Sequence, residues 1–176
     1  MDDLIQLADP IKKRNSLERE ITALICRPAQ IGHIGEYIAS RIFHIVLEES
    51  GSHKGIDGRF SDESLKGCTV NIKWYAMREG LLDITTGALP DYYLVLAGPQ
   101  SAAMTSRGRV RPWIIEAVFL FDAKEISSQL EAQRVQSGIA SSVRKYLWEQ
   151  AEIYPDQKCA KLMVSEEQRK QLALFR

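Results

Sequence analysis

Cysteine is scarce in this chain, and neither sign of charge is in excess. Three cysteines, Cys26, Cys68 and Cys159, are scattered over 176 residues, with no CxxC pair and no Cys/His cluster. This spacing excludes a zinc site of the usual ligand pattern and is typical of reduced core thiols. Twenty-three basic residues balance 23 acidic ones, so the formal net charge is zero. Any contact with a polyanion must therefore come from local basic patches.

Long apolar runs are also missing. The first ten residues, MDDLIQLADP, start with acidic side chains and lack the apolar segment of a signal peptide. No stretch approaches the roughly 20 apolar residues that a membrane-spanning helix needs. We therefore expect no membrane contact and a reducing cytoplasmic location.

The motifs of several large enzyme classes are absent. The sequence contains no GxxxxGK[ST] loop and no GxGxxG turn, which leaves nucleoside-triphosphate and dinucleotide chemistry without support. It also lacks a GxSxG elbow, and its lone serines and cysteines have no base partner at a recognisable spacing. A covalent hydrolase is therefore not expected.

The residues that are present predict one α/β domain over residues 1–176, with helices at both ends. A chain of this length with 45% hydrophobic residues buries one core of ordinary size. Asp9 and Pro10 predict the start of a first helix. Its expected buried stripe consists of Leu17, Ile21, Leu24 and Ile25.

Further helices and strands follow from periodicity and capping residues. A second helix is expected over residues 32–51, and the apolar run at 91–99 is typical of a central strand buried on both faces. Capping pairs predict helices that start at Asp122 and Ser165, and residues 142–154 predict another helix. The expected buried stripe of the second helix consists of Ile34, Ile38, Ile42 and Val46.

The most informative residues lie around one predicted strand, CTVNIKWY. Apolar and polar residues alternate in it, so Asn71 and Lys73 share one face at a separation of about 7 Å. Asp57, in GIDGRF, precedes Asn71 by fourteen residues. Glu36 borders the apolar stripe of the second helix, and a partly buried carboxylate of this kind needs a partner or a metal ion.

In order along the chain come a helix with Glu36, a strand with Asp57, a strand with Asn71 and Lys73, and a further apolar strand. This order resembles the PD-(D/E)XK nuclease superfamily over roughly residues 30–150. The resemblance implies a restriction-endonuclease-like mixed sheet with an αβββαβ core. It also implies that Asp57 and the residue at position 71 bind Mg²⁺ or Mn²⁺, and that Lys73 activates or orients the attacking water. Glu36 would match the helix glutamate of many members. Asn71 departs from the pattern, because the family has Asp or Glu there and an amide offers a carbonyl oxygen without charge.

DNA is the expected substrate of such a protein, and two basic segments could contact it. The better candidate is the loop TSRGRVRP, which carries Arg107, Arg109 and Arg111 beside a glycine. The other is the run Lys12, Lys13 and Arg14 in the first helix. The sequence leaves the oligomeric state open, with a homodimer among the alternatives.

Two other interpretations compete with a metal-dependent nuclease. In the first, Asn71 has removed the metal site, and the protein is a non-catalytic member of the same fold that binds nucleic acid or protein. In the second, the protein is an unrelated α/β protein, in which Asn71 and Lys73 lie on the solvated face of an edge strand and Glu36 forms a salt bridge. The sequence also leaves open whether another acid replaces the missing ligand; the candidates are Asp62, Glu63 and Asp83.

Overall fold

The computed structural model describes residues 2–49, 55–85, 87–100, 110–135 and 137–176, and all structural statements concern these residues. The strands are β1 (Ile45–Leu47), β2 (Gly58–Phe60), β3 (Thr69–Tyr75), β4 (Leu81–Leu82), β5 (Tyr92–Ala97), β6 (Ala117–Asp122), β7 (Ser141–Ser142) and β8 (Glu152–Tyr154). The helices are α1 (Asp2–Ile25), α2 (Ile31–Ile42), α3 (Ala123–Ala132), α4 (Lys145–Ala151) and α5 (Glu166–Ala173). The protein is therefore of the α/β class, as the sequence predicts.

Six strands form one mixed sheet in the order β1-β2-β3-β5-β6-β8. All neighbouring strands are antiparallel except β3 and β5, which run parallel with Val70 opposite Tyr92 and Tyr75 opposite Ala97. The connection from β3 to β5 contains the short strand β4, which pairs with β7, and no helix in its described residues. The strand that carries Asn71 and Lys73 thus lies inside the sheet, between β2 and β5.

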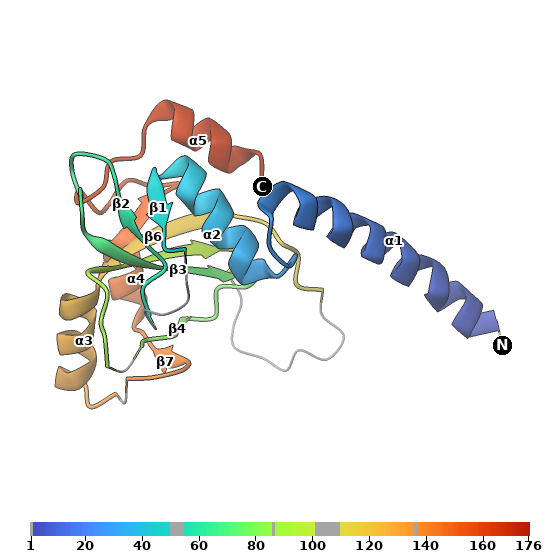
Figure 1. Ribbon diagram of the computed structural model, residues 1–176. Coiled ribbons are helices and arrows are strands. Elements are labelled where there is room, and N and C mark those ends of the chain that lie inside the picture. The colour runs from blue at the N-terminus through green and yellow to red at the C-terminus, as the bar shows by residue number, and fades with distance from the viewer. Residues whose placement is uncertain (1, 50–54, 86, 101–109, 136) are drawn as a thin grey trace.

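Helices cover both faces of this sheet (Figure 1). On one face α2 and α5 pack against Val70, Leu94 and other residues of a first core, while α3 and α4 enclose a second core on the opposite face. Strand β5 contributes alternate side chains to each, with Leu94 in the first core and Tyr93 and Val95 in the second. The near-continuous apolar sequence of this strand is therefore explained by burial on both faces.

Helix α2 lies close against β3 because a glycine faces the strand. A Cβ atom placed on Gly35 would lie 3.0 Å from the Cβ of Trp74. Ile38, Ala39 and Ile42 continue the same buried face. This contact fixes the position of Glu36, the next residue after Gly35, relative to the sheet.

The second helix is shorter than its apolar spacing predicts. It ends at Ile42, and His44 adopts a positive φ of 50° that redirects the chain into β1. Val46, expected in the buried stripe of the helix, lies instead on β1 with 66% of its surface exposed. Its neighbour Ile45 is buried and pairs with Phe60 of β2. Two adjacent β-branched residues favour a strand at this point over continuation of the helix.

The first helix differs from the prediction in both its start and its packing. It begins at Asp2 and contains Pro10 in its interior, so Asp9 is not its cap. Of the four residues expected to be buried, Leu17 and Leu24 are exposed and Ile21 and Ile25 are half-buried, because α1 projects away from the rest of the molecule (Figure 1). Apolar periodicity shows which residues share a helix face, but it does not show that the face is covered.

The C-terminal half confirms both capping predictions. The Asp122 carboxylate accepts hydrogen bonds from the amides of Lys124 and Glu125, and Ser165 and Gln168 form a reciprocal capping box. The helix predicted over residues 142–154 is wrong at its end, where residues 152–154 form β8 and pair with β6. No described helix is long and apolar enough to span a membrane.

We predict that Gly58→Ala destabilises the fold where β1, β2 and Asp57 meet. The added Cβ would lie 2.5 Å from the Val46 carbonyl oxygen and 2.7 Å from Ile45 Cγ2. Overpacking against backbone should lower the free energy of unfolding by roughly 1–3 kcal/mol in a chemical denaturation experiment. Gly32→Ala in α2 is the control, because a Cβ there meets nothing within 4 Å. Equal stability of the two variants would contradict this packing.

Candidate functional site

The four residues singled out by the sequence come from three neighbouring elements. Glu36 lies on α2, Asp57 immediately precedes β2, and Asn71 and Lys73 lie on β3. Strand alternation places Asn71 and Lys73 on the face opposite α2, while Glu36 approaches from the α2 side. Asp57 lies at the edge of β3 between these two groups, as its hydrogen bonds show.

Asp57 is fixed to β3 by two hydrogen bonds. Its backbone amide donates to the Val70 carbonyl at 2.9 Å, and its carboxylate accepts from the Ile72 amide at 2.6 Å. Strands β2 and β3 pair through only two residue pairs, Gly58 with Val70 and Arg59 with Thr69. The Asp57 side chain therefore bonds to the backbone of β3 just beyond the point where strand pairing ends.

The charges around Asp57 oppose one another. Burial raises its pKa above the ordinary value of 3.8, and the negative charge of Glu36 raises it further. The Ile72 hydrogen bond and the positive charges of Lys73 and Arg27 lower the pKa but do not cancel the effect of burial. An ionised Asp57 is thus held in surroundings that favour its neutral form, which is a common property of functional carboxylates.

Glu36 has a partner that the sequence interpretation did not include. Its side chain is mostly buried and forms an ion pair with Arg27, in the segment between α1 and α2. The salt bridge expected in one of the competing interpretations is thereby confirmed. The sequence signal for this ion pair was a basic residue just before the helix that carries Glu36. It could not be used for a prediction, because the side chain of a loop arginine nine residues away can take many positions.

Asn71 and Lys73 differ in their surroundings although they share a face. Asn71 is only 4% exposed, and its Oδ1 atom has no hydrogen-bond partner among the described residues. The Lys73 side chain is half-buried, and its ammonium makes no hydrogen bond or ion pair with a described residue. The prediction of a solvated edge strand is therefore wrong for Asn71. A buried carbonyl oxygen without a donor is costly and needs an explanation.

The donor atoms present suit a hard divalent cation, but the carboxylates are few. Glu36, Asp57 and the Asn71 carbonyl provide oxygen ligands of the type that Mg²⁺ and Mn²⁺ prefer. In the described part of the chain no group of three or more His, Cys, Asp or Glu side chains could hold a metal ion. Asp62, Glu63 and Asp83 therefore do not complete a three-acid set. The Asp83 carboxylate instead accepts a hydrogen bond from the Ala140 amide at 2.7 Å.

The predicted DNA-binding loop is described only at one end. Arg107 and Arg109 lie outside the described residues, as does the rest of 101–109. Arg111 is described, and its guanidinium donates to the Glu79 carboxylate at 2.9 Å. Arg111 is therefore already neutralised by a neighbour.

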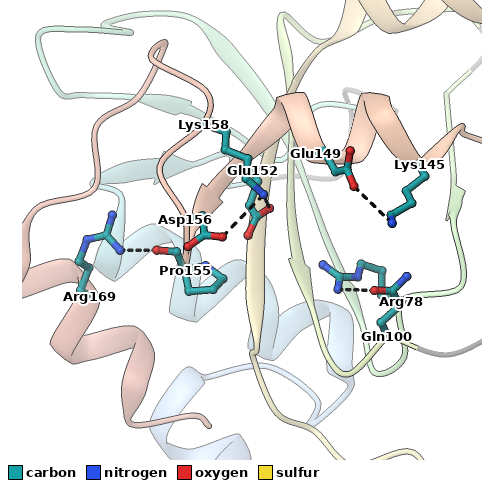
Figure 2. A network of polar contacts seen from close by, with 9 residues as sticks. All are labelled: Arg78, Gln100, Lys145, Glu149, Glu152, Pro155, Asp156, Lys158 and Arg169. Carbon is teal, nitrogen blue, oxygen red and sulfur yellow. Dashed lines mark hydrogen bonds and ion pairs between the residues drawn. The ribbon is translucent and has the colours of Figure 1, made fainter.

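A second concentration of charge lies beside α4 and β8 (Figure 2). It borders a cleft of about 430 Å³, which Glu79 also lines. Each carboxylate in this group is paired with a lysine: Glu149 with Lys145, and Glu152 and Asp156 with Lys158. Every carboxylate drawn there therefore has a lysine partner. We interpret the group as a structural network.

Comparison with known proteins gives no family for the chain. No family model matches it, and no curated protein does. The resemblance to PD-(D/E)XK nucleases thus depends on the residues themselves, above all Asp57, Lys73 and Glu36. The functional conclusion is drawn from their geometry.

The pKa of Asp57 is raised and that of Asp91 is lowered, so replacement by asparagine should change the melting temperature in opposite directions at the two positions. Because the folded pKa of Asp57 is raised, the free energy of unfolding falls as the pH rises from the unfolded pKa through the folded one. Asp57→Asn should therefore unfold at a higher temperature than the parent at pH 7, with the difference shrinking towards pH 4.

Asp91 is the matched control for this experiment. Its carboxylate accepts from the Thr69 amide and hydroxyl, both at 2.8 Å, and these bonds lower its pKa. Its stabilising contribution is present above the unfolded pKa and lost as the pH falls, so Asp91→Asn should lower the melting temperature at pH 7. Destabilisation by both substitutions would contradict the charge arrangement around Asp57.

Proposed function

We propose that the protein is a metal-dependent nuclease-like protein that acts on DNA phosphodiesters. The observation that carries the proposal is the meeting of opposed charges at the edge of β3. A buried carboxylate with a raised pKa, Asp57, lies within electrostatic reach of Glu36 and of the Lys73 ammonium. Further positive charge bound beside Asp57 would offset the cost of burying its ionised form.

In this proposal Asp57 and Glu36 bind Mg²⁺ or Mn²⁺. The Asn71 carbonyl is a third oxygen ligand, which gives its unpartnered Oδ1 atom a role. A cation bound there would polarise a phosphoryl oxygen and lower the pKa of a coordinated water. Arg27 holds Glu36 in position and must give up part of this interaction when the site is loaded.

Lys73 acts on the reacting phosphate in this proposal. Its ammonium has no ion-pair partner among the described residues, so it is free to donate to a phosphate oxygen or to orient the attacking water. Fixed positive charge at this point stabilises the additional negative charge of the transition state. Its anchor on β3, inside the sheet, keeps the side chain in place.

The fold agrees with this proposal in part. A helix followed by three antiparallel strands, α2-β1-β2-β3, and a fourth strand parallel to the third support a restriction-endonuclease-like core. The helix that an αβββαβ core has before its last strand is replaced, in the described residues, by β4. The likeness to a restriction-endonuclease-like core is therefore weaker after β3 than before it.

A second function, non-catalytic binding of nucleic acid or protein by the same fold, is favoured by one specific interaction. The ion pair between Arg27 and Glu36 already supplies one positive charge to the acidic residues. Together with the neutral side chain of Asn71, it could stand in for a metal ion. The two functions differ in whether Asp57 responds to a cation.

We predict that Mn²⁺ raises the melting temperature of the parent protein and not that of Asp57→Asn. Lys73→Met should retain the metal response but no longer cleave plasmid DNA, because it removes no ligand. Asn71→Asp should increase the metal response, since an anionic oxygen binds a hard cation more tightly than a neutral carbonyl. Thermal melts with and without Mn²⁺ and a cleavage assay measure both properties.

The parent and its three site variants separate the two functions. A metal response and cleavage in the parent support the nuclease, whereas a response shown only by Asn71→Asp favours the binding protein. If Mn²⁺ changes the melting temperature of neither the parent nor any variant, no metal binds at Asp57. Asp91→Asn is a control for the general effect of removing an aspartate.

A further prediction concerns the arginines at 107–111. The double change Arg107→Gln with Arg109→Gln should reduce the salt dependence of DNA binding by roughly one unit of slope for each phosphate that is no longer neutralised. Arg111→Gln should change the slope less, because Arg111 is paired with Glu79. The slopes are measured by fluorescence anisotropy over a series of salt concentrations. Equal slopes for all three proteins would show that these arginines do not contact DNA phosphates.

A further inference from the structure

Helix α1 exposes apolar side chains that the rest of the chain does not cover. It projects from the body at its C-terminal end, with its N-terminus far from the sheet (Figure 1). Leu4 is 72% exposed, Leu7 55% and Ile11 47%. Its main contact with the other described helices and strands is with α2. Most helical stability in proteins comes from packing of an apolar face, so the exposed part of this helix is expected to have a partner.

The spacing of these side chains indicates what kind of partner fits. Positions 4, 7, 11, 14, 18, 21 and 25 follow one another at intervals of three and four residues, which is the seam of a two-helix coiled coil. We call these seven positions the seam. Apolar residues occupy both of its ends. Leu4, Leu7 and Ile11 at the N-terminal end are exposed, and Ile21 and Ile25 at the C-terminal end are half-buried.

The two central positions of the seam carry opposite charges. Arg14 and Glu18 are ion-paired within the helix at 2.8 Å. In a parallel pair of α1 helices, each of these residues would face its own copy, and like charges would meet between the helices. In an antiparallel pair, Arg14 can face Glu18 of the other copy.

We propose that α1 mediates self-association of the protein as an antiparallel helix pair with a second copy of this chain. When residue i faces residue 32 − i, Arg14 lies opposite Glu18 of the partner copy, and Glu18 lies opposite its Arg14. The same register places Ile11 opposite Ile21 and Leu7 opposite Ile25. One rotation axis therefore satisfies the apolar and the charged positions together, as a closed two-fold interface requires.

The register also explains why a charged pair occupies the centre of an apolar seam. Polar residues at one level of a coiled coil specify register and orientation, at a cost in stability. Here they favour the antiparallel arrangement over the parallel one. The overlap from Leu7 to Ile25 is about 27 Å long at the helical rise per residue, and Leu17 and Leu24 flank it.

Sedimentation equilibrium of the full chain tests the proposal. The parent protein should form dimers, and Ile11→Gln should weaken association by about a hundredfold, because each dimer then buries two fewer isoleucine side chains. Ile5→Gln is the matched control, since Ile5 is also exposed, at 63%, but lies outside the seam. A monomeric parent protein, or equal effects of the two changes, would overturn the proposal. If the parent is monomeric, the partner of α1 is a different protein.

Charge reversal tests the pairing of Arg14 with Glu18. Arg14→Glu and Glu18→Arg should each weaken self-association, and the double change should restore it. A mixture of the two single variants should form heterodimers, because their seam charges are complementary. Circular dichroism of each variant shows whether α1 still forms. Normal association of both single variants would contradict the pairing.

Engineered cysteines distinguish the two orientations. In a Cys26→Ser background, the pair Leu7→Cys and Ile25→Cys on one chain should give a disulfide-linked dimer on oxidation, since the two positions face each other across an antiparallel interface. Leu7→Cys alone should not crosslink. Crosslinking of the single variant would establish a parallel pair and overturn the proposed arrangement.

Discussion

The buried carboxylate of Asp57 is the constraint on which this part of the structure depends. It occupies the place where β2 stops pairing with β3, and it bonds to the Ile72 amide that β2 no longer reaches. The same position removes it from water and brings it under the influence of Glu36. A structural role as a backbone acceptor and, in the proposed function, a role as a metal ligand thus reside in one side chain. The first stabilises the strand edge, and the second would make use of the raised pKa of the carboxyl group.

Much of the fold could be predicted because its signals are local. Strict alternation predicted β3, a continuous apolar run predicted the buried β5, and the caps at Asp122 and Ser165 depend on residues three apart. The failures occur where tertiary contacts decide. The apolar spacing of α2 continues through Val46, but pairing of Ile45 with Phe60 turns that segment into β1. For α1, periodicity identified an apolar face, but only the whole structure shows that this face lies away from the body.

The candidate site shows the same division. The sequence identified Glu36, Asp57, Asn71 and Lys73, because their residue types and order follow from the strand pattern and a family resemblance. It could not identify Arg27, whose interaction with Glu36 depends on the path of the chain between two helices. It also could not anticipate that Asn71 is buried with an unpartnered carbonyl oxygen, since an asparagine on the polar face of a strand is usually solvated. An antiparallel pair of α1 helices would relate two copies of this site by a two-fold axis, and duplex DNA has local two-fold symmetry of its own.

The most direct test of the central claim is a crystal of the protein soaked in Mn²⁺, with anomalous diffraction recorded near the manganese absorption edge. Our account predicts a peak bound by carboxylate oxygens of Asp57 and Glu36, with Arg27 displaced from its position beside Glu36. A map with no peak at this position, in a crystal where Arg27 and Glu36 remain paired, would contradict it.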